Sequence, residues 1–425
     1  MPNLATLISR TLPEQAEALL REAARVAGAN PDACAELYLV GGPVRDLLLG
    51  ATPADLDLSV VGDAGRFAAA LAAELGGEVS GHSEFGTVKL SARGYDIDLA
   101  TARAETYAHP GALPDVWPAG ITGDLARRDF TVNAMAVDLG VTDPGRWGEL
   151  IDNHGGMTDV TTRRLRVLHD DSFVDDPTRI LRAVRYGARL GFQIERGTRD
   201  LLARDVDGLA AISAARIRAE LEHILAEPSR AAALASAEEL GALAAVSPAL
   251  RVPRRTLEVM ARLAGDDADR PLLFYIALLG AALTASEAEA LVRRLDPPRA
   301  WADILAAGPA YRAVARVLER DDLRPSEAAD VLSPFPRAAL EAQLELGPLP
   351  AQQRWLKAWL TDLSRRRPAL TGDDLLAEGV PQGPLVGKLL DELRRAALDR
   401  TARTRDEELA LVRRRLPTLL DREQG

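Results

Sequence analysis

The spacing of apolar residues divides the chain into three stretches. Before residue 37 the apolar positions recur with a helical period, which predicts helix. From 37 to about 140, short apolar runs alternate with glycine-containing turns, and these runs predict strands at 37–40, 56–61, 86–91, 95–101 and 132–139. From about 160 onward only helical patterns remain, with prolines at their boundaries. The pattern therefore predicts a small α/β head on a long helical body.

The expected fold class is α+β, with a small mixed or antiparallel sheet and its helices in the head and an all-α remainder. A chain of 425 residues is too long for one hydrophobic core, so several domains are expected. The predicted division is an N-terminal helical segment, a head, a helical neck, a helical body and a helical tail, at 1–36, 37–150, 151–228, 229–345 and 346–425.

Composition excludes several classes of protein. Apolar residues make up 47% of the chain and aromatic residues only 4%, so Ala, Leu and Val build the core, as in packed helices. The single cysteine, Cys34, excludes a disulfide framework and a cysteine-based zinc site. No apolar run approaches the roughly 18 residues of a membrane span, and the N-terminus lacks a signal-peptide core. The expectation is a soluble cytoplasmic protein.

Charge is distributed unevenly along the chain. The net charge of −11 argues against non-specific coating of nucleic acid. Residues 163–199 nevertheless hold nine arginines against five acidic residues. A local basic groove therefore remains compatible with the overall acidity.

A glycine pair and two aspartates form the first candidate site. The segment GGPVRDLLLG at 41–50 follows an apolar run, and Asp55-Leu56-Asp57 comes soon after it. Glycines let the backbone approach a phosphate, because no Cβ blocks the way. Residues at i and i+2 of a strand share a face, so Asp55 and Asp57 can together hold metal ions against a triphosphate. Either motif alone marks an ordinary turn or a chance pair, but their order along the chain favours a phosphate-and-metal site.

A further carboxylate lies on a predicted neighbouring strand. In YDIDL at 95–99, Asp96 and Asp98 alternate with apolar residues and therefore share one face. Asp98 is the candidate to complete the metal site or to activate an attacking hydroxyl. The alternative is that both aspartates are solvated strand residues.

Paired arginines form the third candidate site. In DLARRDFTVNAMA at 124–136, Arg127, Arg128 and Asp129 precede small apolar residues that must pack, so the position of the arginines is expected to be fixed. The planar guanidinium donates two parallel hydrogen bonds and is a natural partner of phosphate. A lone Arg-Arg pair is otherwise usually surface charge.

The fourth candidate site begins a predicted helix at DDPTRILRAVR, residues 175–185. Asp176 and Arg179 are three residues apart and share a face, which Arg182 and Arg185 extend. A fixed carboxylate acceptor beside a fixed guanidinium donor can recognise the amino group and ring nitrogen that cytosine and adenine both present. The alternative is that Asp176 only interacts favourably with the helix dipole and forms a simple i,i+3 ion pair with Arg179.

These segments together resemble the class II tRNA nucleotidyltransferases, in the polymerase-β-like superfamily that contains CCA-adding enzymes and bacterial poly(A) polymerases. The matching segments are GGPVRDLLLG with DLD, RRDFTVNAM, IDNHGG, DDPTRILRAVR and the segment RIRAEL at 216–221. The resemblance implies a polymerase-β-like head, a neck that recognises the base, and a body and tail that bind tRNA by its acceptor and TΨC arms. The family transfers nucleotides from ATP and CTP and releases pyrophosphate.

The resemblance also implies roles for individual residues. Asp55 and Asp57 would hold two Mg²⁺ ions, and Asp176 and Arg179 would select the base without a nucleic-acid template. Asp175 stands where the family usually has Glu, one methylene longer. The other nucleotide-binding candidates are the loop residues Gly41, Gly42 and Arg45, the head residues Arg127, Arg128 and Asp129, and the helix residues Arg182 and Arg185.

Three activities share this framework: addition of CCA, of CC alone, or of the terminal A alone. CC-adding members lack part of a flexible loop in the head, whereas 23 residues at 104–126 here resemble a full-length loop. That loop is rich in Pro and Gly and lacks Lys and Arg, which leaves CCA addition and A addition open, with CCA addition the first expectation. Poly(A) polymerases usually carry a basic C-terminal extension, and a non-catalytic RNA-binding protein would lack the aspartates, so both are weaker alternatives.

Overall fold

The computed structural model of the chain describes residues 2–82, 86–266 and 270–424. It separates into two compact units, Met1–Val246 (unit 1) and Ser247–Gly425 (unit 2). Unit 1 contains the predicted head and neck together, and the finer division into five segments stays a prediction. Among the described residues, no helix combines the length and the apolar character that crossing a bilayer requires.

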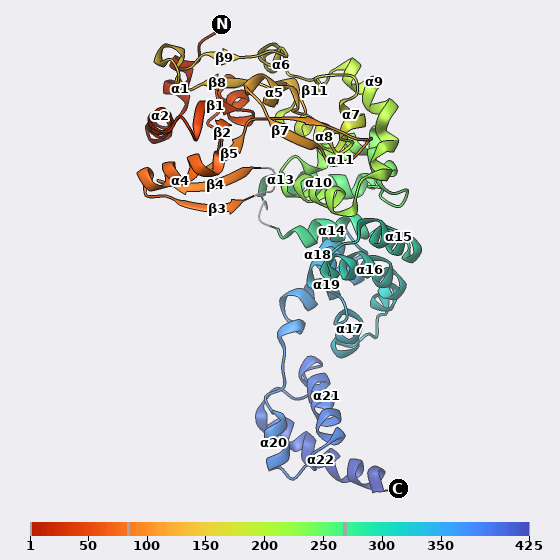
Figure 1. The fold of residues 1–425 in the computed structure, drawn as a ribbon. Helices are drawn as coiled ribbons and strands as arrows, with labels where there is room; N and C mark the ends of the chain where they lie inside the picture. The colour runs from red at the N-terminus through yellow and green to blue at the C-terminus, as the bar shows by residue number, and fades with distance from the viewer. Residues whose placement is uncertain (1, 83–85, 267–269, 425) are drawn as a thin grey trace. The chain divides into compact units, whose positions relative to one another are not determined.

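Unit 1 begins with two helices and continues into strands and short helices (Figure 1). Its strands are β1 (Cys34–Val40), β2 (Leu56–Gly62), β3 (Glu78–His82), β4 (Thr87–Ala92), β5 (Tyr95–Thr101), β6 (Arg103–Thr106), β7 (Asp115–Pro118), β8 (Ala136–Asp138), β9 (Leu150–Ile151), β10 (Arg164–Leu165) and β11 (Gln193–Ile194). Its helices are α1 (Ala5–Thr11), α2 (Glu14–Ala29), α3 (Gly42–Leu48), α4 (Ala64–Leu75), α5 (Ile121–Ala126), α6 (Gly156–Thr161), α7 (Ser172–Asp175), α8 (Thr178–Leu190), α9 (Arg196–Asp205), α10 (Ala214–Ala226), α11 (Arg230–Glu239) and α12 (Ala242–Val246), with 3-10 turns η1 (Thr131–Asn133), η2 (Pro144–Arg146) and η3 (Val206–Ala211).

The main sheet has seven strands in the order β3-β4-β5-β2-β1-β8-β9. Its pairs are antiparallel except for β2 and β5, which run parallel. The sheet is therefore mixed, and the expected α+β class is confirmed. Helix α4 contacts β2 to β5, and α2 contacts β1 and α4.

The side chains of β2 alternate between a buried face and a polar face. Leu56, Leu58 and Val60 are buried, whereas Asp57 points to the opposite face because successive side chains alternate. On that opposite face the Ser59 hydroxyl donates at 3.3 Å to Oδ2 of Asp124, which lies within α5. One face of β2 thus belongs to the core, and the other leads to a polar site.

Most predicted strands are confirmed, but one predicted run is shorter than expected, and the strands β3, β6, β7, β9, β10 and β11 were not predicted. The run at 132–139 yields only β8, because Thr131–Asn133 forms the 3-10 turn η1. The two-residue strands β10 and β11 pair in parallel inside the stretch that was predicted to be entirely helical. The unpredicted strands have two to five residues, and apolar periodicity carries little information over such short segments.

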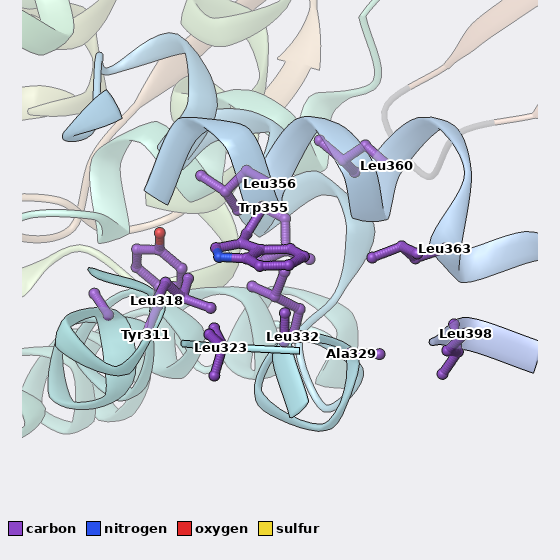
Figure 2. Packing of buried hydrophobic residues seen from close by; sticks show 13 residues of the cluster. Tyr311, Leu318, Leu323, Ala329, Leu332, Trp355, Leu356, Leu360, Leu363 and Leu398 are labelled. Carbon is purple, nitrogen blue, oxygen red and sulfur yellow. The ribbon is translucent and has the colours of Figure 1, made fainter. Parts of the chain in front are cut away.

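Unit 2 is helical, as the periodicity predicted. It comprises α13 (Arg254–Asp266), α14 (Leu272–Gly280), α15 (Ala285–Leu295), α16 (Arg299–Val314), η4 (Ala315–Glu319), α17 (Pro325–Leu332), α18 (Arg337–Glu345), α19 (Pro350–Thr361), η5 (Leu363–Arg365), α20 (Gly372–Ala377), α21 (Pro384–Leu398) and α22 (Arg405–Gln424). One apolar cluster centres on Trp355 and Leu356 of α19 (Figure 2), and a second is formed by α20 to α22.

Candidate active site

A cavity of about 850 Å³ opens within unit 1, between residues of the predicted head and residues of the neck helix α8. Its size is near the upper end of the range for small-molecule sites. Most of the predicted site residues line it: Gly41, Gly42, Arg45, Asp55, Asp57, Arg127, Arg128, Asp129, Asp176, Arg179 and Arg182. Segments more than a hundred residues apart in the chain therefore meet at one site.

The glycine turn makes room for an arginine. Gly41 has a φ of +71°, and a Cβ built on it would lie 2.6 Å from Arg128 Nη1. A Cβ on Gly42 would lie 3.5 Å from Arg45 Nη2 and 4.0 Å from Asp57 Oδ2. Only glycine combines this φ with so close an approach at position 41, whereas a Cβ at position 42 would make ordinary van der Waals contacts.

The two aspartates of the first motif stand at the start of β2. Asp55 is exposed in the bend before the strand, and Asp57 is partly buried within it. Burial and the neighbouring Asp98 raise the pKa of Asp57 to about 6, and Asp55 adds to this, while Arg128 and Arg45 oppose it. Carboxylates that repel one another in this way favour a bound cation, and their oxygen atoms are the ligands that Mg²⁺ prefers.

Asp98 is next to Asp57 but outside the cavity lining. The two residues are register partners across the parallel β2–β5 pair. Asp98 Oδ1 lies 3.4 Å from the Lys89 ammonium on β4. In the described parts of the chain, no three His, Cys, Asp or Glu residues form a group that could hold a metal ion. The third-carboxylate role of Asp98 stays a prediction.

A buried carboxylate holds the paired arginines. Asp124 Oδ1 accepts from Arg127 at 2.6 and 3.0 Å, and Asp124 Oδ2 accepts from Arg128 Nη2 at 2.9 Å. Burial alone would raise the pKa of Asp124, but the two guanidinium groups hold it below its usual value. Sequence reasoning did not assign Asp124 a role, although its i,i+3 and i,i+4 spacing to the arginines was a usable signal.

Asp129 joins the head to helix α8. Its Oδ2 accepts from Arg182 Nη2 at 2.6 Å and Nε at 2.9 Å, in a bidentate pair. Its Oδ1 accepts from Asn133 Nδ2 at 3.0 Å, and Asn133 Oδ1 in turn accepts from Arg45 Nη1 at 2.6 Å. Asn133 was missed by sequence reasoning, and it connects the glycine-turn helix to the arginine motif.

Asp176 and Arg179 are predicted to select the base and are called the base-recognition pair below. They are fixed by different partners. Asp176 Oδ1 accepts from Arg216 Nη2 at 2.6 Å and from the Thr178 hydroxyl at 2.6 Å. The Arg179 guanidinium donates to the Ser172 hydroxyl at 2.8 Å and to the Arg127 carbonyl at 2.9 Å. None of these four hydrogen bonds joins the side chain of Asp176 to that of Arg179. The pair is therefore oriented by its surroundings rather than by a simple i,i+3 ion pair.

Arg185 is not brought to the cavity. It is buried, and its guanidinium donates to Glu220 at 3.3 Å and to Glu227 at 3.2 Å. The predicted nucleotide contact is therefore replaced by an ion-pair network with acids of α10 and its C-terminal cap. Each step of three residues falls about 60° short of a full turn, so Arg185 lies about 120° around the helix from Arg179.

Aromatic residues also line the cavity. Tyr107 follows β6, and Tyr186 lies on α8. The Arg185 and Arg189 guanidinium groups each lie 4.7 Å from the centroid of the Tyr186 ring. No sequence motif pointed to either tyrosine.

Comparison with known proteins agrees with this geometry. Residues 37–166 match the family model of the poly A polymerase head domain, and residues 191–252 match a model described as a probable RNA- and SrmB-binding site of polymerase A. A CC-adding tRNA nucleotidyltransferase of Deinococcus radiodurans is 35% identical over 95% of this chain and 94% of its own length. The chain belongs to the tRNA nucleotidyltransferase family.

Other members of the tRNA nucleotidyltransferase family share parts or all of the chain. An A-adding tRNA nucleotidyltransferase of Geobacter sulfurreducens is 33% identical over 96% of this chain, which spans about half (48%) of that relative's length. Two further A-adding relatives are also spanned only in part, at 56% and 20% of their lengths. A solved structure of a CCA-adding enzyme in an apo form covers 97% of this chain and 98% of its own, with 27% identity and a TM-score of 0.81.

Proposed function

We propose that this tRNA nucleotidyltransferase adds the 3′-terminal CCA, or only its terminal A, to tRNA from CTP and ATP. The observation that carries the proposal is that one cavity holds Asp55, Asp57 and the base-recognition pair. Similar proteins include a CCA-adding enzyme solved with ATP, another with CTP, and a Thermotoga maritima CCA-adding enzyme complexed with tRNA.

Asp55 and Asp57 are the proposed ligands of two Mg²⁺ ions. Their carboxylates provide hard oxygen donors. The pKa of Asp57 is raised by burial first and then by the charge of Asp98, and a bound cation would offset both effects. Bound ions of this kind lower the charge on the triphosphate and favour ionisation of an attacking hydroxyl. Asp98, on the neighbouring strand, stays a candidate for a third carboxylate.

The arginines of the cavity are the proposed triphosphate ligands. Arg128 approaches the Gly41–Gly42 turn, and Arg127 and Arg182 are oriented by Asp124 and Asp129. Pairing with buried carboxylates fixes each planar guanidinium before the nucleotide arrives, which reduces the entropic cost of binding. Arg45 and Asp129 are the proposed supports of this site, because both are buried: Arg45 donates to Asp46 and Asn133, and Asp129 accepts from Arg182.

Asp176 and Arg179 are the proposed base ligands. A carboxylate acceptor and a guanidinium donor match the amino group and ring nitrogen that cytosine and adenine share. Guanine and uracil present a carbonyl and a ring N–H at those places, so the same pair would leave them unpaired. The 3′ hydroxyl of tRNA would then attack the α-phosphate of the selected nucleotide, with pyrophosphate as the leaving group.

Complete CCA addition is the first candidate, since the loop at 104–126 is of full length and solved CCA-adding enzymes align over nearly the whole chain. Addition of A alone is the second. It is favoured by hydrogen bonds that tie the loop to the neck, from Gly111 N to the Val174 carbonyl at 3.2 Å and from Arg216 Nη1 to the Gly111 carbonyl at 3.2 Å. A loop held in one position by hydrogen bonds favours a pocket of one shape, which would accept only one kind of base.

The proposal is tested with tRNA transcripts that end at the discriminator base or at CC. Purified protein and Mg²⁺ are supplied with CTP, ATP or both, and products are resolved at single-nucleotide length. Extension of the discriminator end to CCA identifies a complete CCA-adding enzyme. Extension of the CC end alone, by one A, identifies an A-adding enzyme. No extension of either transcript by wild-type protein would overturn the proposed function, with Asp55→Ala as the inactive control that still binds tRNA.

A further inference from the structure

Tyr107 lies in the cavity beside the base-recognition pair, at the start of the Pro/Gly-rich loop. Its hydroxyl donates to Glu105 Oε2 at 3.1 Å. Burial raises the pKa of Tyr107 to about 12, and the charges of Arg179, Glu105 and Asp176 also act on it. These charges come from both members of the base-recognition pair, which agrees with a tyrosine that stands next to them.

A chain of hydrogen bonds connects Tyr107 to Arg179. Glu105 Oε1, on the same carboxylate that accepts from Tyr107, accepts from Arg127 Nη1 at 3.0 Å. The Arg127 carbonyl accepts from Arg179 Nη2 at 2.9 Å. The position of the Tyr107 hydroxyl is therefore coupled to the donor that would select the base.

A second connection runs from the same loop to Asp176. Four residues after Tyr107, the Gly111 carbonyl accepts from Arg216 Nη1 at 3.2 Å, and Arg216 Nη2 donates to Asp176 Oδ1 at 2.6 Å. The segment 107–111 is thus attached at one end to Arg179 and at the other to Asp176. An aromatic ring in a segment held at both ends offers a fixed flat surface rather than a mobile one.

Recognition of a base by its edge leaves the two faces of the base without partners. An aromatic ring against one face contributes stacking energy for any base, because every base has a π-face. Tyr186 is less suited to this task, since guanidinium groups already lie over its ring. Tyr107 combines a ring in the cavity with a hydroxyl anchored on protein.

We propose that the Tyr107 ring is the stacking surface for the base of the incoming nucleotide. This inference rests on the proposed function and assigns base selection and base stacking to different residues. Asp176 and Arg179 would discriminate between bases by hydrogen bonding, whereas Tyr107 would hold cytosine and adenine alike.

The experiment compares three variants of the full chain. Tyr107→Ala removes the ring, and Tyr107→Phe keeps the ring but loses the bond to Glu105. Trp117→Ala is the matched control, because Trp117 lies on the same ribbon, is 45% exposed, and pairs with Ala104 on the face opposite to Glu105. Dissociation constants are measured by calorimetry with Mg²⁺ for ATP, CTP and the base-free probe tripolyphosphate.

The expected result is that Tyr107→Ala weakens ATP and CTP binding by about tenfold each and leaves tripolyphosphate unchanged. Tyr107→Phe and Trp117→Ala should bind all three as the wild type does. Equal nucleotide affinity in Tyr107→Ala would overturn the inference, as would an equal loss for tripolyphosphate. A loss in Tyr107→Phe as large as in Tyr107→Ala would also overturn it, because the hydroxyl anchor and not the ring would then matter. Failure of the wild type to bind either nucleotide would instead refute the proposed function.

Discussion

Individual residues of the site differ in their effect on the free energy of unfolding. The clearest case is Asp57, whose pKa is raised to about 6 by burial and by Asp98. The folded state holds this proton more tightly than the unfolded state, in which the pKa of Asp is about 3.9. The ionised carboxylate therefore destabilises the metal-free fold as pH rises from about 4 to about 6, and the full cost persists above that range.

Asp57→Asn should accordingly stabilise the metal-free protein at pH 7.5 by roughly 1–3 kcal/mol while it abolishes nucleotide transfer. The gain should disappear at about pH 3, which is below both pKa values, because the wild-type carboxyl is then mostly protonated in both states. Urea unfolding in the presence of a chelator, at both pH values, measures the difference. A gain of equal size at both pH values would show that charge is not its cause.

Gly41 is a second residue whose substitution has a predictable effect, because its backbone conformation and its close neighbour both favour glycine. Gly41→Ala should cost about 1–3 kcal/mol of stability, because φ is +71° there and a Cβ would press on Arg128. The displaced arginine should also raise the KM for ATP and CTP. Gly28→Ala is the control, since Gly28 lies in α2 with no atom near its Cβ position, and it should be neutral or stabilising. An unaltered KM in Gly41→Ala would remove Arg128 from the triphosphate site.

Among the elements, α8 has two faces with different surroundings. Arg179, Arg182, Tyr186 and Arg189 line the cavity, whereas Arg185 is buried against Glu220 and Glu227. The cavity face would bind the nucleotide, and the other face holds α8 to the following helix. Equal spacing in the motif gave no means of distinguishing these arginines.

Arg185→Ala should therefore behave as a stability variant. Removing one partner of a buried ion pair leaves its acids uncompensated, at a cost of about 3 kcal/mol, while the KM for nucleotides should change little. Arg182→Ala should instead raise that KM. Thermal unfolding and steady-state kinetics of both variants separate the two effects. A KM change in Arg185→Ala equal to that in Arg182→Ala would return Arg185 to the nucleotide site.

At the scale of the whole molecule, unit 2 has an apolar core of its own. Figure 2 shows Trp355, Leu356 and Leu360 of α19 packed with residues from α17 and the turns around them. Leu356 is fully buried in this cluster, whereas Val317 on η4 is 36% exposed. The cluster stabilises the part of the chain that would bind tRNA.

Leu356→Ala should destabilise this cluster by about 2–5 kcal/mol, through lost burial and the cavity left behind. Hydrogen exchange should become faster in peptides from 311–363. Val317→Ala is the matched control and should leave their exchange nearly unchanged. Equal protection in the two variants would show that Leu356 does not contribute to the cluster as its burial indicates.

How much could be predicted from the sequence differs between elements. Strands with regular alternation, such as β2 and β5, and the helices of unit 2 were predicted because their periodicity is local. The edge strand β3 and the two-residue strands β10 and β11 were not, because they depend on partners rather than on their own pattern. For the site, motif residues were predicted, but Asp124, Asn133 and Tyr107 were not assigned.

The sequence by itself determined the order of elements, the glycine turn, and the short spacings that keep Asp55 near Asp57 and Asp176 near Arg179, although Asp176 has an extended backbone just before α8 and does not share its helical face. These properties follow from backbone geometry over a few residues, which the chain carries wherever it folds. Only the tertiary structure decided that Arg185 faces acids, that Arg216 holds Asp176, and that Tyr107 enters the cavity. Such contacts depend on helix rotation and strand register between residues far apart in the chain, which no local spacing fixes.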